Sequence, residues 1–554
     1  GLTIQADLRR VCKMKNWNGI GVSDGLIVGR AVRMQKVQTK KLTSLEQVKE
    51  SCIKRTAELY ESTKEKMGEA QAEVFTAYQM LLLDPKLYKG VNQRLEQGRE
   101  LEQAIEEGFE DLAHVFDGMT NEYMRQRAED IRGLKKMHLD MLNGKKTTFQ
   151  DVGERNYILV AEEVTAIDFA MIDVEHLGGL VVRQGGRFSH AMIMARALNI
   201  PAVTGLKEIE EIHDGDELFV DGNTGEIAMI ELRERGRIAP KDQHILAIWK
   251  KKFRKKVERE EVLKNLPTGK NVTADGTEIQ LRVNINGPSD LKNLDLSALQ
   301  GVGLYRTEYL FFERKEMPDI REQQEEYEKV FDLLDGKTLV VRTLDVGGDK
   351  RVPYLAANKE ENPFLGVRGI RLTLKKPEVL ETQMEALLRS ARGRAFSIMF
   401  PMVDTVEEVQ QAREIWKRVC SRVKADGCEV HPDIRLGITI ETPAAAICVD
   451  QFVKEIDFVS IGSNDLAQYL MAADRENVEL DHLLSPWQPA VMRVIQHVIQ
   501  VCNEYGVEVS VCGEAGGEPE YLKHLIRNGL RIVSVSKSRV DMTRLAISET
   551  MIEL

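Results

Sequence analysis

The sequence predicts a multidomain α/β protein whose C-terminal half is a (β/α)₈ barrel of the TIM type. Three observations lead to this prediction. Short apolar runs alternate with helical stretches after residue 266, a helical segment interrupts an α/β region near the N-terminus, and a charged stretch separates the two parts. At roughly 100–200 residues per domain, 554 residues are enough for three or four domains.

Residues 35–147 are predicted to form a helical subdomain. Ser44 and Gln47 match a capping box at the start of its first helix. After them, small or apolar side chains recur every three or four residues, the spacing of one buried helix face. These residues are Leu45, Val48, Cys52, Thr56, Leu59, Thr63 and Met67.

The segments on either side of this subdomain resemble each other. Residues 1–34 and 148–232 both contain short β-like runs punctuated by glycine and Asn-Thr-Gly turns. We therefore expect one discontinuous α/β domain that carries residues 35–147 as an insertion, since closing a longer loop costs little free energy. Residues 233–265 are dominated by Lys, Arg and Glu and predict a solvated connecting helix.

Residues 266–554 contain eight candidate strands, most of them followed by a helical stretch. Eight β/α units over this length fit a (β/α)₈ barrel, which usually takes about 250 residues. The candidate strands are IQLRVNIN, VGLYRTEYLF, LVVRTLDVGG, FLGVRGI, FSIMFPMV, LGITIET, FVSIGSNDL and VEVSVCGEA.

Polar residues follow these apolar runs, at the places where a barrel carries its functional side chains. Guanidinium groups stay charged and offer paired donors to phosphate and carboxylate, and two carboxylates suit Mg²⁺. The pattern predicts a small phosphorylated acid bound through a metal. A ring of structural ion pairs is the alternative. The residues are Arg306, Arg342, Arg368, Glu441, Asn464, Asp465, Arg475 and Cys512.

Cys512 has two interpretations. A free cysteine is commonly a small core residue. Its place between a β run and Gly513 points instead toward the barrel mouth, where a thiol would give a proton to a developing carbanion or enolate. Both interpretations remain open from the spacing alone.

A second candidate centre lies at residues 185–205, GGRFSHAMIMARALNIPAVTG. Ser189 suits an N-cap, which places His190 in the first turn of a helix with Ile193 on its inner face. Backbone donors and the dipole at a helix N-terminus favour a phosphoryl group there. The alternative is a histidine that caps or packs against the loop.

Composition excludes several classes of function. Net charge is −11, 43% of residues are apolar, and no block of Lys and Arg suggests nucleic-acid binding. No apolar run reaches the 18 or more residues of a membrane helix, and the first residues show no signal-peptide core. Seven scattered cysteines without a C-x-x-C pair favour reduced thiols. We therefore expect a cytoplasmic protein.

Taken together, the two centres resemble Enzyme I of the bacterial phosphoenolpyruvate:sugar phosphotransferase system, the phosphoenolpyruvate-protein phosphotransferases. The resemblance runs from about residue 18 to 545 in the order of segments of that family. Besides the 185–205 segment, it rests on GVGLYRTEYLF, VVRTLDVGGDK, NPFLGVRGIR, ITIETPAAA, FVSIGSNDLAQYLMAADREN and VCGEAGG.

The resemblance implies a role for each candidate residue. His190 would be the residue that is phosphorylated, and Cys512 the proton donor that turns enolpyruvate into pyruvate. Glu441 and Asp465 would be the Mg²⁺ ligands. The implied phosphoenolpyruvate-binding residues are Arg306, Arg342, Asn464 and Arg475, with Arg368 in a motif that lines the same pocket.

The resemblance also implies architecture and partners. The α/β domain would be a swivelling phosphohistidine domain, its helical insertion would dock the histidine phosphocarrier protein HPr, and the barrel would form a homodimer. The enzyme would phosphorylate itself from phosphoenolpyruvate and pass the group to HPr, the first step of sugar uptake by this system. The connector at 233–265 is then the candidate hinge.

The chain departs from the family pattern beside His190 and Arg475. Phe188 and Ala191 stand where hydroxyl residues are usual, and Glu476 stands where glycine is usual. These changes motivate an alternative, a divergent non-catalytic regulator that binds phosphoenolpyruvate or HPr. ATP-dependent relatives are not expected to match, because no glycine-rich phosphate cradle precedes the His190 segment.

Overall fold

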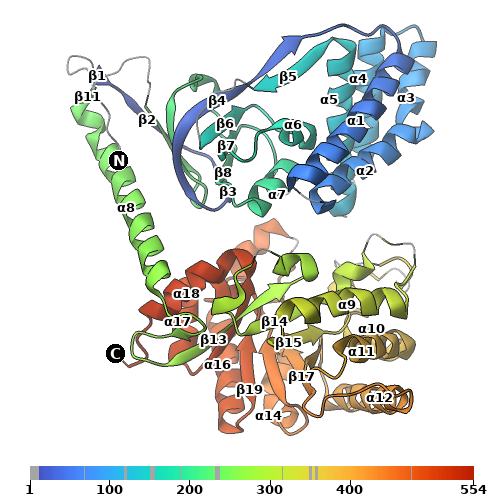
Figure 1. The fold of residues 1–554 in the computed structure, drawn as a ribbon, viewed down its shortest axis with the longest axis vertical. Coiled ribbons are helices and arrows are strands. Elements are labelled where there is room, and N and C mark those ends of the chain that lie inside the picture. The colour runs from blue at the N-terminus through green and yellow to red at the C-terminus, as the bar shows by residue number, and fades with distance from the viewer. Residues whose placement is uncertain are drawn as a thin grey trace. The chain divides into compact units, whose positions relative to one another are not determined.

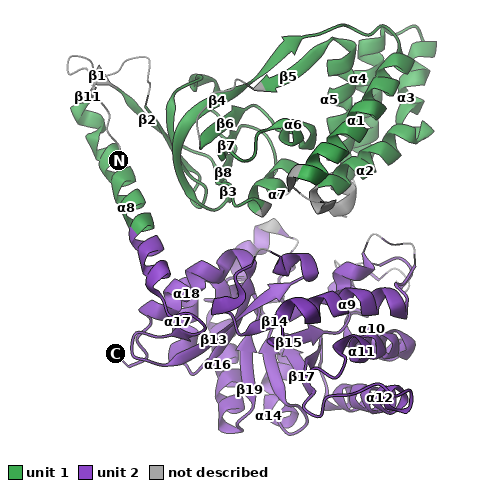
Figure 2. Ribbon diagram, in the orientation of Figure 1, with its two compact units in different colours: residues 1–257 green, residues 258–554 purple. Residues whose placement is uncertain are grey.

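The computed structural model forms two compact units, residues 1–257 and 258–554 (Figure 2). It describes residues 11–553 except 68, 118–121, 150–155, 187–188, 231–236, 293, 313, 315, 349–351, 356–359 and 476.

The first unit is built on one mixed sheet (Figure 1). The central strands are buried because both of their faces are covered by apolar side chains. One face packs against α6 (Ala166–Met171) and α7 (His190–Ala197). The strand order of the sheet is β2 (Met14–Asn18), β10 (Glu226–Ile230), β9 (Glu217–Asp221), β4 (Leu26–Gln38), β6 (Tyr157–Ala161), β7 (Leu177–Val182), β8 (Ala202–Thr204) and β3 (Ile20–Ser23).

A bundle of helices is inserted between β4 and β5 (Lys145–Phe149), which pair with each other. The predicted inner face of the first helix is confirmed, since Val48, Cys52, Thr56, Leu59 and Thr63 are all buried. The capping box is only half formed: the Ser44 hydroxyl accepts the Gln47 N–H, whereas the Gln47 side chain accepts from Thr43. The helices are α1 (Leu45–Met67), α2 (Glu69–Leu83), α3 (Pro85–Glu96), α4 (Leu101–Asp117) and α5 (Glu122–Leu142).

Only residues 243–265 of the charged stretch form the connecting helix, α8 (Gln243–Asn265), in which the division between the two units falls. Before it lie a short strand, β11 (Arg237–Ile238), and a 3₁₀ turn at Pro240–Asp242. The first half of α8 is anchored rather than wholly solvated. Trp249 is buried and packs on Phe219 of β9 with ring centroids 5.7 Å apart, and Phe253 also contacts Phe219. Lys252 pairs with Asp221 at 2.8 Å.

The second unit is a closed barrel of eight parallel strands surrounded by helices (Figure 1), which confirms the predicted fold class. The barrel closes where β20 pairs with β13. A short strand, β12 (Asn271–Val272), adds to β13 in the antiparallel sense. The barrel strands are β13 (Glu278–Ile285), β14 (Gly301–Arg306), β15 (Thr338–Arg342), β16 (Ser397–Phe400), β17 (Arg435–Ile440), β18 (Phe458–Ile461), β19 (Glu508–Val511) and β20 (Ile532–Ser536).

One predicted strand was wrong. FLGVRGI forms a 3₁₀ turn at Pro363–Leu365 and then the start of α10 (Ile370–Lys375). Pro363 cannot donate to a sheet, and Gly369 has φ +57°, far from the extended conformation of a regular strand. Arg368 therefore lies in a loop before a helix and not at a strand end. The eighth strand is β20.

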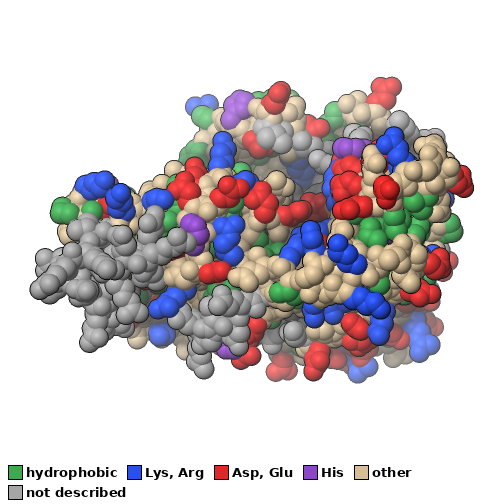
Figure 3. All heavy atoms as spheres, turned by 90° about the horizontal axis from the view of Figure 1, so that it is seen from above, with side chains coloured by type: hydrophobic (Ala, Val, Ile, Leu, Met, Phe, Trp, Pro, Cys, Tyr) green, Lys and Arg blue, Asp and Glu red, His purple; other side chains and the backbone are tan. Residues whose placement is uncertain are grey.

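Charged side chains of both signs are interspersed over the described part of the face in Figure 3. This agrees with the sequence, in which no basic block stands apart from acidic residues. Within the described residues, no helix combines the length and the apolar character needed to cross a membrane.

Substitution of two barrel glycines tests how closely neighbouring strands approach each other. Gly301 opens β14 with φ +146°, and a Cβ there would lie 2.0 Å from the Thr338 carbonyl oxygen of β15. Gly336 has φ +82°, but nothing lies within 4 Å of its Cβ position. We expect Gly301→Ala to lower the free energy of unfolding by about 3 kcal/mol or more and Gly336→Ala by about 1 kcal/mol. Urea unfolding followed by circular dichroism measures both, and equal losses would contradict this account.

Candidate active site

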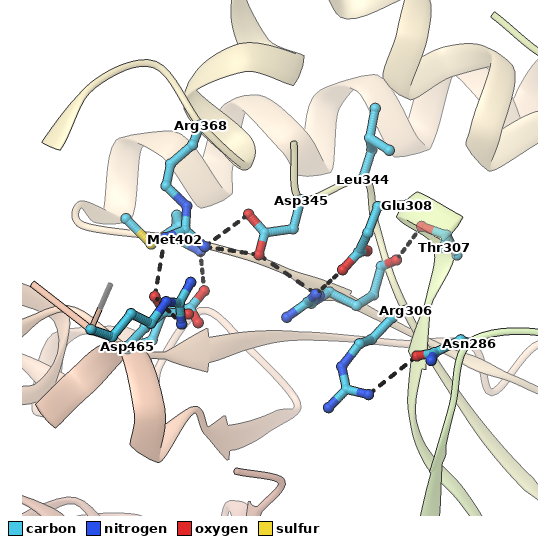
Figure 4. Close-up of polar contacts among 12 residues, drawn as sticks. Asn286, Arg306, Thr307, Glu308, Leu344, Asp345, Arg368, Met402 and Asp465 are labelled. Carbon is cyan, nitrogen blue, oxygen red and sulfur yellow. Dashed lines mark hydrogen bonds and ion pairs between the residues drawn. The ribbon is translucent and has the colours of Figure 1, made fainter. Parts of the chain in front are cut away.

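Two arginines end neighbouring barrel strands. Arg306 is the last residue of β14 and Arg342 the last residue of β15, and the register pairs them directly. Arg342 is buried, and its Nη2 donates to Glu308 Oε1 at 2.5 Å. Arg306 Nη1 donates to Asn286 Oδ1 at 3.2 Å (Figure 4). Both guanidinium groups are thus fixed by acceptors beside them.

Asp345 links Arg342 to a third arginine, Arg368 (Figure 4). Its Oδ2 lies 3.5 Å from Arg342 Nη2 and 3.0 Å from Arg368 Nη2. Arg368 is fully buried and also donates from Nη1 to Asp465 Oδ1 at 3.0 Å. Burial alone would lower the pKa of Arg368, but the carboxylates of Asp345 and Asp465 outweigh it and raise that pKa.

The two predicted metal ligands lie close together. Glu441 directly follows β17, and Asp465 lies in the first turn of α15 (Ser463–Met471). Both are buried, and Glu441 Oε1 accepts the Met402 N–H at 2.7 Å. Burial first, and then the negative charge of Asp465 and Asp345, raise the pKa of Glu441 to about 8. The carboxylates therefore repel each other, which a bound cation would relieve.

This donor set fits Mg²⁺ and not a metal held by protein ligands alone. Among the described residues, no group of three or more His, Cys, Asp or Glu side chains is placed to hold a metal. Mg²⁺ usually takes one or two protein carboxylates and fills its other positions with water and substrate oxygens. Glu441 and Asp465 are two buried carboxyl groups at the mouth of the barrel that could serve as such ligands.

Asn464 and Arg475 complete the same rim. Asn464 Oδ1 accepts a hydrogen bond from the backbone N–H of Glu514 at 3.1 Å. This bond joins α15 to the loop after β19. Arg475 Nη1 lies 3.3 Å from Asp465 Oδ1, and the Arg475 backbone N–H donates to Gln468 Oε1 at 2.9 Å.

Cys512 directly follows β19 and is buried. Its thiol donates to the Ile461 carbonyl at 3.6 Å and packs in an apolar cluster inside the barrel with Leu304, Val340, Met399 and Phe458. Burial raises the pKa of Cys512, so the thiol holds its proton at neutral pH. A protonated thiol at the barrel mouth can serve as an acid. Cys512 is both a buried core residue and a residue at the end of a barrel strand, so its position agrees with both interpretations given above.

The structure thus brings all eight predicted barrel residues to the C-terminal side of the strands. Contacts run without a break from Arg342 through Asp345, Arg368 and Asp465 to Arg475. Sequence reasoning missed Glu308 and Asp345, the acceptors that hold the arginines. Both follow a strand-end arginine within three residues, a signal that could have identified them.

His190 lies in the first unit at the start of α7, with Ser189 at the N-cap position but without a side-chain cap bond. His190 Nε2 lies 2.7 Å from Oδ1 of Asp130, a buried residue of α5 in the helical insertion. Sequence reasoning missed Asp130, because 60 residues separate the two and a carboxylate on an amphipathic helix carries no local signal. The prediction for Ile193 was wrong, since it is 41% exposed.

The Asp130 contact fixes where the imidazole proton lies. A carboxylate only accepts, so in the neutral ring Nε2 carries the proton and Nδ1 the lone pair. Attack through Nε2 would require His190 to leave Asp130. Of the departures beside the site, Ala191 is buried in the sheet-facing core, whereas Phe188 and Glu476 lie outside the described residues.

Three models of PEP-utilising enzymes match the chain in order. The N-terminal model matches residues 18–127, the mobile-domain model 153–225 and the PEP-binding-domain model 260–552. Similar proteins named phosphoenolpyruvate-protein phosphotransferase come from Geobacillus stearothermophilus (36% identity, 98% of this chain, 96% of the relative), Listeria innocua (37%, 96% and 93%) and Bacillus subtilis (36%, 97% and 95%).

Substitution of Asp345, the carboxylate shared by two buried arginines, tests how much this network stabilises the barrel. Asp345→Asn keeps the shape but removes the charge, so we expect the free energy of unfolding of the barrel to fall by about 3 kcal/mol. Glu325→Gln, which removes the exposed partner of Arg321 3.1 Å away, serves as control and should change it by less than about 1 kcal/mol. Chemical unfolding measures both, and similar effects would mean that Asp345 contributes little to the network.

Proposed function

The chain belongs to the family of phosphoenolpyruvate-protein phosphotransferases, and we propose that His190 carries the phosphoryl group from phosphoenolpyruvate to the histidine of HPr. The protein is an enzyme that transfers a phosphoryl group from phosphoenolpyruvate to protein. The observation that carries the residue assignments is the cluster of buried, pre-oriented arginines at the barrel mouth.

The balance of charge in this mouth supports the binding of a cation. Four guanidinium groups, those of Arg306, Arg342, Arg368 and Arg475, face four carboxyl groups, those of Glu308, Asp345, Glu441 and Asp465. The guanidinium charges are therefore largely offset, although the raised pKa of Glu441 leaves that carboxyl mostly protonated at neutral pH. A divalent cation makes the mouth positive, which favours a multiply charged anion in a site shielded from water.

We assign substrate binding to Arg306, Arg342, Arg368, Asn464 and Arg475. The acceptors Asn286 and Glu308 orient Arg306 and Arg342 before substrate arrives. Such pre-oriented donors stabilise charge as it develops on phosphate oxygens without reorganisation during the reaction. Glu441 and Asp465 would hold Mg²⁺, which supplies neutralisation of phosphate charge when bound.

His190 accepts the phosphoryl group as a neutral imidazole, because only an unprotonated nitrogen has the lone pair that attacks phosphorus. Asp130 holds the ring and sets the nitrogen that carries the proton. After the transfer, a positive charge on the ring is stabilised by the carboxylate beside it. His190 and the barrel mouth belong to different units, so the proposed transfer takes place between the two units.

Cys512 completes the reaction by protonating the leaving enolate. The thiol S–H bond breaks, and a C–H bond forms at the methylene carbon to give pyruvate. Its burial at the end of β19 and its raised pKa keep the proton available at neutral pH. Ketonisation of the product draws the transfer forward.

Domain roles and partners are part of the same proposal. Residues 1–34 with 148–232 would be the phosphohistidine domain, 35–147 the HPr-docking insertion, 233–265 the linker, and 266–554 the phosphoenolpyruvate-binding barrel, which would also form the homodimer. Membership of the family supports these assignments. The six described free cysteines support a cytoplasmic location.

The alternative, a non-catalytic regulator, needs the residues that bind phosphoenolpyruvate or HPr but not the residues that take part in the reaction. The presence of His190, Glu441, Asp465 and Cys512 in the arrangement described above favours catalysis. The two readings differ in whether the protein becomes phosphorylated.

Labelling with ³²P-phosphoenolpyruvate and Mg²⁺ tests the proposal. We expect one acid-labile phosphoryl group per chain, lost in His190→Ala because the nucleophile is gone. His244→Ala, which removes an exposed histidine of the same unit, should label normally. Mass spectrometry of the adduct locates the label. Label that persists in His190→Ala, or no label in the wild type, would exclude His190 as the carrier.

Arg306→Ala tests the assignment of the barrel mouth. Loss of one charged donor to the transferring group should lower kcat/KM for labelling by about 10²–10³-fold. Arg314→Ala removes a half-buried arginine that pairs with Glu322 outside the mouth and serves as the control. Rapid-quench labelling measures both variants, and near-normal transfer by Arg306→Ala would place the substrate elsewhere.

A further inference from the structure

One buried side chain joins the two barrel strands that end in arginine. Gln383 lies on α11 (Pro377–Ala391), one of the helices outside the barrel, and is fully buried. Its Oε1 accepts the backbone N–H of Leu344 at 2.9 Å, and its Nε2 donates to the Thr307 hydroxyl at 2.9 Å. Thr307 directly follows β14, and Leu344 lies two residues after the end of β15. The Gln383 amide therefore bridges the chain just beyond both strand ends.

The direction of each hydrogen bond in this cluster is fixed. A backbone N–H can only donate, so the amide oxygen of Gln383 faces Leu344 and its NH₂ group faces the Thr307 hydroxyl. An NH₂ group can only donate in turn, so this hydroxyl accepts from Gln383 and points its own hydrogen elsewhere. It donates to the Arg342 carbonyl at 2.8 Å (Figure 4). One buried amide thus directs a hydrogen bond onto the backbone of a strand-end arginine.

A second branch of the cluster leads away from the arginines. Gln383 Nε2 also donates to the hydroxyl of Tyr327 on α9 (Ile320–Leu334) at 3.2 Å. The Tyr327 hydroxyl donates to Gln323 Oε1 at 3.0 Å, and Gln323 Nε2 donates to the Pro318 carbonyl at 3.0 Å. Tyr327 and Gln323 are both buried. The two hydroxyls that Gln383 contacts therefore share their burial and their pattern of bonds but hold different parts of the chain.

The first branch satisfies backbone groups that the sheet no longer pairs. The ladder between β14 and β15 ends at Arg306 and Arg342. Buried backbone groups beyond such an end need other partners. The Arg342 carbonyl receives its partner from Thr307, and the Leu344 N–H receives its partner from Gln383. These bonds fix the backbone on which the second arginine and the carboxylate after it stand.

We propose that Gln383 and Thr307 are positioning residues that fix the backbone of Arg342 and thereby aim its guanidinium group at the transferring phosphoryl group. The proposal rests on the proposed function, in which Arg342 binds phosphoenolpyruvate. Gln383 and Thr307 are fully buried and act through the Arg342 backbone rather than on the substrate. The alternative is that the amide serves stability alone.

Thr307→Val and Tyr327→Phe form a matched pair of variants. Each removes one buried hydroxyl that accepts from Gln383 and donates one hydrogen bond, so both should lower the midpoint of urea unfolding by similar amounts. Only Thr307→Val releases the Arg342 carbonyl. We expect it to lower the maximal rate of labelling by ³²P-phosphoenolpyruvate about tenfold, because misplaced donors stabilise the transition state less. Tyr327→Phe should label at the normal maximal rate.

Two further measurements separate positioning from damage to the fold. The phosphoenolpyruvate concentration that gives half of the maximal rate should stay unchanged in Thr307→Val, because the guanidinium charge is still present. Thr307→Ser should restore the maximal rate by restoring the hydroxyl. Rapid-quench labelling over a range of substrate concentrations gives both quantities for each variant.

Gln383→Glu takes the place of Thr307→Val if that variant does not fold. Its side chain keeps the acceptor for the Leu344 N–H and nearly the same shape. An ionised carboxylate only accepts, so the Thr307 hydrogen turns toward it and leaves the Arg342 carbonyl. We therefore expect the maximal rate of this variant to fall further below that of the wild type as pH rises and the carboxyl ionises.

The outcomes distinguish this proposal from the one on which it rests. Normal maximal rates in Thr307→Val and Gln383→Glu, or equal losses of rate in Thr307→Val and Tyr327→Phe, would overturn the positioning role and leave the phosphotransferase reaction intact. An Arg342→Ala protein that labels at the wild-type rate would instead overturn the assignment of Arg342 to the substrate.

Discussion

The site depends on the pairing of buried positive charge with buried negative charge at one end of the barrel. Arg342 and Arg368 cannot remain out of water unless carboxylates lie beside them, and Asp345 serves both. The same pairing fixes the direction of each guanidinium group before any ligand is present. A site for a small anion that reacts as it binds needs such fixed donors, because donors that reorganise during the reaction stabilise the transition state less. Stability and function therefore draw on the same contacts in this part of the molecule.

The protein places His190 and the charged end of the barrel on separate units. The barrel carries the buried arginines, the carboxyl groups and Cys512, whereas the first unit carries His190 beside Asp130. Helix α8 belongs to both, and its first half is tied to the sheet by Trp249 and Phe253. Any bending of α8 between the two units must therefore take place beyond those aromatic residues, because the packed turns move with the sheet.

Local sequence patterns predicted the helices and strands better than they predicted which distant residues contact each other. Strand-end positions located Arg306, Arg342, Glu441 and Cys512, because a barrel fixes where its strands end. The eighth strand was missed because Ser534 and Ser536 make IVSVS look half polar, although Ser534 faces the interior. FLGVRGI was mistaken for a strand because its apolar content outweighed Pro363 and Gly369. Asp130 and His190 meet only through packing of the insertion on the sheet, which no local pattern records.

Closure of the barrel by β20 has a consequence for synthesis of the protein on the ribosome. Arg306, Arg342 and Glu441 emerge early, but the edges of β13 and β19 stay unpaired until the last strand leaves the exit tunnel. A nascent chain would thus expose two open sheet edges beside an unfinished charged site for most of the time needed to make the barrel. Competition between strand pairing in the same chain and pairing with neighbouring chains is strongest in that interval. Translation speed over the final segment thereby becomes a determinant of yield.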